Sequence, residues 1–225
     1  MGMCGRYTLS TPVEDLAIHF AVAGPVPPLV PRYNVAPSQL VAVVGLKPDG
    51  VLRGLARLQW GLLPYWSPDG KGVRPINARA ETLLSKPTFR EPFLEKRCLI
   101  PADGFYEWRA EGRKKYPHHF RLRAGGGVMA FAGLWDCWRG EDGRALVTCC
   151  IVTLEANEVV KPFHDRMPAV IGPDAYTDWL AHGTPVQELQ GLLRTLPTEY
   201  LEVVPANPLL NSPKHDSVEC LIPPV

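Results

Sequence analysis

The sequence lacks the features that mark membrane, secreted and uniformly basic proteins. No apolar run approaches the roughly 20 residues that a membrane-spanning helix needs. The first residues, MGMCGRYTLS, have neither the basic segment nor the long apolar stretch of a secretion signal. The formal net charge of the 225 residues is only +1, which excludes a surface that is basic all over. We therefore expect a protein of the cytoplasm or the nucleus.

Cysteine pairs and glycine-rich loops are also missing. The 6 cysteines form no C-x-x-C pair and no cysteine–histidine spacing typical of zinc. No glycine-rich loop for a phosphate group is present, and a disulfide framework is not expected without a secretion signal. The sequence therefore predicts no metal and no cofactor, and most of the cysteines are expected to be small buried hydrophobic residues.

Short extended segments dominate what is present. The chain is 46% hydrophobic, enough for an ordinary core. Runs of β-branched and aromatic residues, separated by turn signals such as KPDG and RGEDG, are typical of strands. Strands are predicted over 40–45, 97–108, 118–124, 128–135, 146–155, 167–172 and 201–207.

Helices are few. The segments TPVE (11–14) and TPVQ (184–187) each combine an N-cap threonine, a proline and a capping Glu or Gln, and each predicts a helix. Shorter helices are expected over 174–181 and 78–84. No repeat and no linker divides the chain. The predicted fold class is therefore α+β, a single domain over residues 1–225, dominated by antiparallel strands with a few short peripheral helices.

Five local clusters hold polar or charged residues among apolar neighbours. They are CGRY (4–7), RYNVAPSQ (32–39), INARAET (76–82), ADGFYEW (102–108) and PFHDRMP (162–168). Residues that lie far apart in sequence but converge in a fold are typical of active sites. In this order, from Cys4 to about Asn207, the clusters resemble the SOS-response-associated peptidase (SRAP) domain. The resemblance implies barrel-like sheets and a protein that recognises abasic sites in single-stranded DNA and cross-links to them, protecting the lesion in the DNA damage response.

The chemistry of such a cross-link can be argued for Cys4 itself. An abasic deoxyribose opens to an aldehyde. A cysteine at a free N-terminus offers an α-amine and a thiol, whose ordinary pKa values are near 8 and near 8.5. The amine can form an imine with the aldehyde. The thiol then closes a five-membered thiazolidine ring in an intramolecular step, which favours closure.

The resemblance assigns partners to Cys4. Asn77 would hold the sugar or the nucleophile, and Glu107 would act as general acid/base near the cysteine amine. His164 would move a proton to or from the sugar ring oxygen, work that suits a group titrating near neutral pH. Each residue also has a plain structural interpretation. Asn77 could cap a helix that begins near Ala78, Glu107 could be a surface strand residue, and His164 could belong to a loop held by an aspartate–arginine pair.

Contacts with DNA are expected from residues close to these candidates. Arginine side chains bind phosphates bidentately, and an aromatic ring can stack on a base beside a kink in the strand. The predicted DNA-binding residues are Arg6, Arg79 and Arg166 for phosphates, Trp66 for stacking, Lys86 for a further phosphate, and Asn34, Pro37 and Thr153 as lining of the same cleft.

The first three residues bear on the proposed reaction. Met1-Gly2-Met3 precede Cys4, and an amide nitrogen cannot form the imine. Three explanations are open. Translation begins at Met3, which we favour; the protein cleaves its own N-terminus; or the molecule binds DNA without cross-linking.

Three functions remain open at this point. The first is the abasic-site cross-linker, for which a linked lyase step by β-elimination from the imine is chemically open. The second is a cysteine peptidase in which Cys4 and His164 act as nucleophile and base, with Asn77 as orienter. The third is a non-covalent reader of single-stranded DNA, junctions or modified bases. The expected partner is single-stranded DNA with abasic sites, with no membrane and no metal. The expected state is a monomer, near the nucleoid in a bacterium or in the nucleus of a eukaryote.

Overall fold

The computed structural model describes residues 5–123 and 127–223, so Cys4 lies outside the described residues. The strands are β1 (Tyr7–Leu9), β2 (Arg32–Val35), β3 (Leu40–Leu46), β4 (Arg53–Trp60), β5 (Asn77–Arg79), β6 (Arg97–Ala102), β7 (Gly104–Glu111), β8 (Lys114–Leu122), β9 (Met129–Arg139), β10 (Ala145–Glu155), β11 (Arg166–Pro168), β12 (Val170–Ile171) and β13 (Leu201–Pro205). The α-helices are α1 (Val13–His19), α2 (Pro87–Glu95), α3 (Tyr176–Leu180) and α4 (Val186–Leu192). No helix in these ranges is long and apolar enough to cross a membrane.

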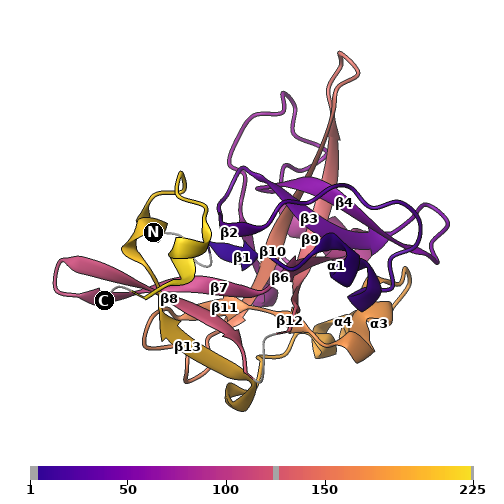
Figure 1. Cartoon of the computed structure of the whole chain (residues 1–225). Helices are drawn as coiled ribbons and strands as arrows, with labels where there is room; N and C mark the ends of the chain where they lie inside the picture. The colour runs from indigo at the N-terminus through magenta and orange to yellow at the C-terminus, as the bar shows by residue number, and fades with distance from the viewer. Residues whose placement is uncertain (1–4, 124–126, 224–225) are drawn as a thin grey trace.

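Part of the main sheet closes on itself as a barrel. Its strands follow one another around the ring in the order β4–β3–β6–β9–β10. The ring is completed where β10 returns to β4, with Thr148 opposite Gln59 and Cys149 opposite Trp60. This closing pair is parallel, whereas its neighbours around the ring are antiparallel. The α+β class, with antiparallel strands dominant, is confirmed (Figure 1).

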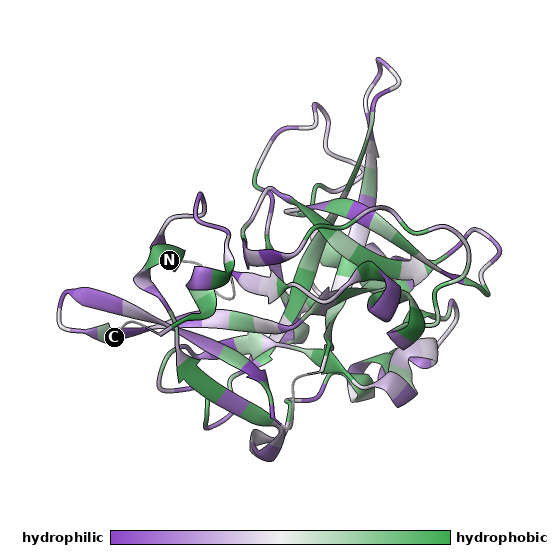
Figure 2. Cartoon of the chain, viewed as in Figure 1, coloured by the Kyte–Doolittle hydropathy of each residue, from purple (hydrophilic) through white to green (hydrophobic). Residues whose placement is uncertain are grey.

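Small residues let the barrel close around a narrow core. A Cβ added at Gly133 of β9 would lie 2.7 Å from Cys98 Sγ and 3.0 Å from the Ile100 side chain, so no larger residue fits there. Cys98, Cys149 and Cys150 are fully buried, and burial raises the pKa of each thiol. The barrel strands are correspondingly hydrophobic (Figure 2). These thiols are core residues, as expected.

A second sheet, the flanking sheet, packs against the barrel and has the strand order β13–β8–β7–β1–β2. Aromatic rings join the two. Tyr7 of β1 meets Trp60 of β4 and Phe131 of β9 at ring-centroid distances of 5.4 and 6.0 Å. Such edge-to-face pairs stabilise by about 1 kcal/mol each beyond their burial. The chain passes from the barrel to this sheet between β6 and β7, so the predicted strand over 97–108 is two strands that break at Asp103.

The break at Asp103 explains one incorrect prediction at a helix start. The Asp103 carboxylate accepts hydrogen bonds from the backbone N–H of Ser10 at 2.5 Å and the hydroxyl of Thr11 at 2.6 Å. The Thr11 hydroxyl therefore does not cap α1, whose N-cap residue is Pro12. Likewise the Thr184 hydroxyl donates to the Asp178 carbonyl, and the N-cap of α4 is Pro185. The helices were predicted correctly, but not their caps.

One predicted helix, over 78–84, does not form. Asn77–Arg79 form strand β5, which pairs in parallel with β10, and only a 3₁₀ turn, η1 (Ala80–Thr82), follows. Because β5 pairs with β10, its backbone is held in an extended conformation, and a helix cannot begin there. Asn77 is therefore a strand residue, and the interpretation of it as a helix cap is wrong. In contrast, α2 was not predicted, because Pro87 and Pro92 obscure its pattern.

Candidate functional site

A cleft of about 490 Å³ is lined by β7 of the flanking sheet and by the segments that precede β1, β3, β5 and β11. Four of the predicted site residues, from widely separated segments, line it together: Arg6, Pro37, Glu107 and His164. Gly5, the residue directly after Cys4 in the sequence, lines it as well. The further lining residues are Ile76, Trp108, Arg113, Lys115, Phe163 and Asn211. Residues of the segment before β1, of β7 and of the segment before β11 therefore converge in one cleft.

Glu107 occupies the wall that β7 contributes. It lies opposite His118 of β8 and is only 5% exposed. The interpretation of Glu107 as an ordinary surface strand residue is therefore wrong. A buried carboxyl group in the wall of a cleft is a candidate for proton transfer to or from a bound substrate.

His164 is held by the backbone beside it. Its Nδ1 accepts a hydrogen bond from the Arg166 backbone N–H at 3.0 Å. An Nδ1 that accepts cannot carry a proton, so in the neutral ring the proton sits on Nε2. Asp165 Oδ1 also lies 2.8 Å from Nδ1, where it can bind the protonated ring. Both protonation states therefore have a partner at Nδ1, while Nε2 is the nitrogen that can exchange a proton with a substrate.

Asn77 sits at the start of β5, next to the cleft residue Ile76. Its strand partner on β10 is Ile151. Thr153, further along β10, is completely buried, and its hydroxyl donates to the Ala78 carbonyl at 3.5 Å. The expectation that Thr153 lines the cleft is therefore not met. Its hydroxyl instead contacts the backbone of β5, the strand that carries Asn77.

Arg166 was expected to bind phosphate, yet both terminal nitrogens of its guanidinium already make hydrogen bonds within the protein. Nη1 and Nη2 each donate to a carboxylate oxygen of Glu81 at 2.8 Å, and Nη2 also donates to the Thr153 carbonyl at 2.6 Å. The residue is 8% exposed. The hydrogen bond from Arg166 lowers the pKa of Glu81. In this structure Arg166 ties η1 to β10 and β11 and does not present its fork to solvent.

The Arg6 guanidinium, which lines the cleft, also makes hydrogen bonds within the protein. Its Nη1 donates to Asn34 Oδ1 at 2.8 Å and to the Leu210 carbonyl at 2.6 Å. Its guanidinium carbon lies 6.0 Å from the centre of the Trp108 ring. Burial lowers the pKa of Arg6. Through these contacts Arg6 fixes the segment that directly follows Cys4 in the sequence.

Asn34 is wholly buried and cannot itself reach a strand of DNA in this conformation. Its Nδ2 donates to the carbonyls of Ser212 and His215, at 3.0 and 2.6 Å. The side chain thus bridges Arg6 and the C-terminal segment. The expectation that Asn34 lines the cleft is not met, and its role here is to position Arg6.

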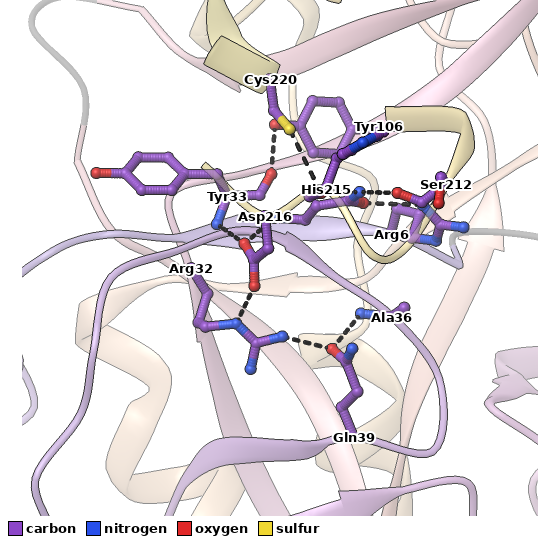
Figure 3. Close-up of polar contacts among 11 residues, drawn as sticks. Arg6, Arg32, Tyr33, Ala36, Gln39, Tyr106, Ser212, His215, Asp216 and Cys220 are labelled. Carbon is purple, nitrogen blue, oxygen red and sulfur yellow. Dashed lines mark hydrogen bonds and ion pairs between the residues drawn. The ribbon is translucent and has the colours of Figure 1, made fainter. Parts of the chain in front are cut away.

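The sequence alone did not predict that the C-terminal segment, residues 208–223, contributes to the site. This segment contains two 3₁₀ turns, η4 (Pro208–Asn211) and η5 (Val218–Leu221), and covers the outer face of the flanking sheet. Asp216 binds the Arg32 guanidinium and accepts the backbone N–H of Tyr33 at 2.5 Å (Figure 3). Because β2 is the outermost strand, this carboxylate satisfies N–H groups that no further strand can bind. The local sequence PKHDSV has no pattern that predicts this contact of Asp216 with β2.

The remaining candidates lie on the surface outside the cleft lining. Trp66 is 52% exposed, and Arg79 and Lys86 are also exposed. Trp66 belongs to the loop between β4 and β5, which is anchored on both sides of it. The Tyr65 N–H donates to Asp136 at 2.8 Å, and Trp138 Nε1 donates to the Ser67 carbonyl at 2.7 Å. The exposed ring is therefore presented from a fixed backbone.

The described residues contain no group of three or more His, Cys, Asp and Glu side chains placed to hold a metal ion. Two residues that the sequence did not single out, Arg113 and Lys115, add positive charge to the cleft wall. The signal that could have found them is the basic turn EGRKKY.

Fold and cleft together define an α+β protein with a closed barrel, a flanking sheet and a cleft in which charged side chains from widely separated segments meet. Residues 3–213 match the family described as SOS response associated peptidase (SRAP), and the chain belongs to this family. The predicted resemblance is thereby confirmed.

The similar proteins agree in their names. The protein called abasic site processing protein YoaM, from Bacillus subtilis (strain 168), is 42% identical, and the match covers 97% of this chain and 97% of that protein. The abasic site processing protein HMCES of Gallus gallus is 33% identical, over 86% of this chain and 66% of its own length. A crystal structure of a protein from Bacteroides thetaiotaomicron superposes with a TM-score of 0.89 at 24% identity, covering 99% of this chain and 100% of that one. That structure supports the fold alone.

Proposed function

We propose that this protein recognises abasic sites in single-stranded DNA and links covalently to them through Cys4, protecting the lesion. The observation that carries the proposal is the single cleft in which Gly5, Glu107 and His164 meet. It supplies two proton-transfer groups beside the residue that follows Cys4. The names of the relatives YoaM and HMCES support abasic sites as the substrate.

The reaction proceeds in two bond-forming steps. The α-amine of Cys4 adds to the aldehyde carbon of the open sugar, and loss of one water gives an imine. The Cys4 thiolate then adds to the imine carbon, and a proton goes to the nitrogen, which closes the thiazolidine ring. Because both nucleophiles belong to one residue, the second step is intramolecular.

The cleft residues supply protons and orientation. Glu107 takes a proton from the Cys4 ammonium group and returns one when water leaves. His164, with its Nε2 proton, serves the sugar ring oxygen as the ring opens and closes. The Asn77 amide holds the sugar or the nucleophile. A lyase step, by β-elimination from the imine, would compete with ring closure.

Recognition of the strand uses the exposed candidates. Arg79 and Lys86 bind phosphates, and Trp66 stacks on a base next to the lesion. Pro37 contributes apolar wall inside the cleft. Arg6, Asn34, Thr153 and Arg166 make hydrogen bonds within the protein and position the residues around the cleft.

The reaction needs Cys4 as the first residue of the mature chain, and we propose that translation from Met3 followed by removal of that methionine supplies it. The test is a denaturing gel of protein mixed with single-stranded DNA that carries one abasic site. Protein beginning at Cys4 should give an adduct that survives denaturant. Cys4→Ala should abolish it, while Cys137→Ala, a partly exposed cysteine elsewhere, should not. Absence of adduct from protein with a confirmed N-terminal Cys4 would contradict the proposal.

A cysteine peptidase is the second candidate, favoured by the word peptidase in the family description. Cys4 would act as nucleophile, His164 as base and Asn77 as orienter. Cleavage of added peptides, blocked by alkylating the thiol, would support it. We expect self-processing of the N-terminus at most.

A further inference from the structure

The β7–β8 hairpin extends beyond the flanking sheet as an arm, which we define as residues 108–117. β1 pairs with β7 at Gly104 and Phe105. β13 pairs with β8 as far as His118, and the Ala206 N–H just after β13 donates to the Pro117 carbonyl. Beyond that point the described strands β7 and β8 pair with each other alone. Residues 109–116 are all exposed. At about 3.3 Å per residue, the arm reaches about 17 Å past Glu107. Figure 1 shows β7 and β8 extending together beyond the rest of the flanking sheet.

The arm concentrates positive charge. It carries four basic side chains against one carboxylate, so its net charge is +3, while the whole chain has a net charge of +1: Arg109, Arg113, Lys114 and Lys115 against Glu111. The remainder of the protein is therefore slightly acidic, and the arm is a local basic surface. Figure 2 shows hydrophilic residues toward its tip.

The other long hairpin shows that this charge is not a general property of exposed turns. The β9–β10 hairpin also projects from the molecule (Figure 1). Its tip, residues 139–144, has two arginines and two carboxylates. Asp142 accepts a hydrogen bond from Arg144 Nε at 2.5 Å, so part of that charge is neutralised within the turn.

The arm is continuous with the cleft. Glu107 and Trp108 at its base line the cleft, as do Arg113 and Lys115. Gly112, with φ of 61°, occupies the first central position of the two-residue turn, as a type II′ hairpin requires. The turn therefore holds the basic side chains in a defined place along one edge of the cleft.

We propose that the arm binds the phosphate backbone of the DNA strand that flanks the lesion. This inference rests on the proposed function, because it places the strand that enters the cleft along the arm. Exposed lysines and arginines bind phosphates by releasing the counterions of the nucleic acid, and this makes binding depend steeply on salt. The arm thus supplies affinity for the strand, while the cleft recognises the lesion.

The test measures binding of a fluorescent single strand that carries an abasic analogue without an aldehyde, so that no covalent product forms. The double substitution Arg109→Gln, Lys114→Gln, at two arm residues outside the cleft lining, is compared with Arg139→Gln, Arg144→Gln on the β9–β10 hairpin. Both remove two positive charges from an exposed hairpin. For the arm variant, the slope of log K against log salt should fall by about 1.4, at about 0.7 per lost contact with a single strand. For the control variant the slope should not change.

A second probe that ends next to the lesion separates the arm from the cleft. Because Arg109 and Lys114 lie outside the cleft lining, their substitution should weaken binding of the long probe and leave binding of the short one unchanged. Equal slopes for the arm variant and the unsubstituted protein would overturn the role of the arm while leaving the proposed function intact. If the unsubstituted protein binds neither probe, the proposed function itself fails, and the role of the arm fails with it.

Discussion

Arg166 and Glu81 form a bidentate ion pair, with both nitrogen–oxygen distances at 2.8 Å, that links β11, the strand after His164, to η1, the turn after Asn77. The arginine is 8% exposed, whereas the glutamate side chain is 55% exposed. Glu81 therefore supplies the counter-charge that allows the Arg166 guanidinium to remain buried. It also holds two candidate catalytic residues at a fixed separation on either side of β10.

Replacing Glu81 by Gln should lower the free energy of unfolding by about 1–3 kcal/mol, because the buried Arg166 guanidinium loses its counter-charge. The adduct should also form more slowly. Urea denaturation measures the first effect. Glu91→Gln is the matched control, since its partner Lys96 keeps Asp136 at 2.9 Å, and it should cost less than about 1 kcal/mol. Equal stability of the Glu81 and Glu91 variants would contradict a structural role of the pair.

Asn34→Leu tests whether the C-terminal segment holds the N-terminal strand. The substitution leaves the carbonyls of Ser212 and His215 without their donor and Arg6 without one acceptor. We expect a loss of about 2–4 kcal/mol in unfolding free energy and slower adduct formation at saturating DNA. Asn207→Ala, which removes the cap of η4, should cost only about 1 kcal/mol. A fast, stable Asn34 variant would show that Arg6 needs no such support.

His119 should make the protein sensitive to acid. Burial lowers the pKa of His119 to about 4, and the imidazole Nε2 lies 3.1 Å from the Thr8 hydroxyl. The unfolded chain binds this proton near pH 6.5, so stability is unaffected above that pH and falls as the pH declines toward 4. The loss should approach about 3 kcal/mol. It should be missing from His119→Gln in urea titrations at several pH values; an unchanged acid loss in that variant would assign it to other groups.

How much of this could be predicted from the sequence differs between the fold and the site. Alternating apolar runs predict strands, but not that β10 closes the barrel by pairing with β4, because Thr148 and Gln59 are far apart in the chain. The threonine caps failed because Asp103 and the carbonyl of Asp178 compete for the two hydroxyl groups. Such tertiary competition has no local signature.

For the site, the motifs identified residues that do converge, including Glu107 and His164. They could not tell a side chain that faces the substrate from one that holds its neighbours. Arg166 and Asn34 have the polar groups of a DNA contact, yet the terminal nitrogens of Arg166 and the amide of Asn34 are hydrogen-bonded within the protein. Only the positions of Glu81 and the C-terminal segment reveal this.

Trp66→Ala should weaken DNA binding without affecting the fold. The ring is 52% exposed, so its removal should change stability by less than about 0.5 kcal/mol. A lost base stack should reduce affinity by about 1–3 kcal/mol, measured by fluorescence anisotropy with single-stranded DNA. Tyr200→Ala, at a ring 57% exposed in the turn before β13, is the control and should bind normally. Similar losses in both variants would argue against a specific stack.

His164→Gln should slow both formation and reversal of the adduct, because a single group exchanges the proton in both directions. Rates from quenched time points on denaturing gels measure both. His182→Gln, at an exposed histidine beside Glu95, provides the comparison and should leave the rates unchanged. Unchanged rates in the His164 variant would remove this residue from the mechanism.

The central claim is a covalent bond at Cys4, and intact mass spectrometry tests it most directly. The purified protein is weighed alone and after mixing with a short single strand that carries one abasic site, and the adduct is then digested to locate the modified residue. The account predicts the mass of a chain that begins at Cys4. After mixing, it predicts one adduct per protein on the N-terminal peptide, with a mass equal to protein plus DNA minus one water. A protein that begins at Cys4 yet gains no mass, or gains it on another residue, would contradict the account.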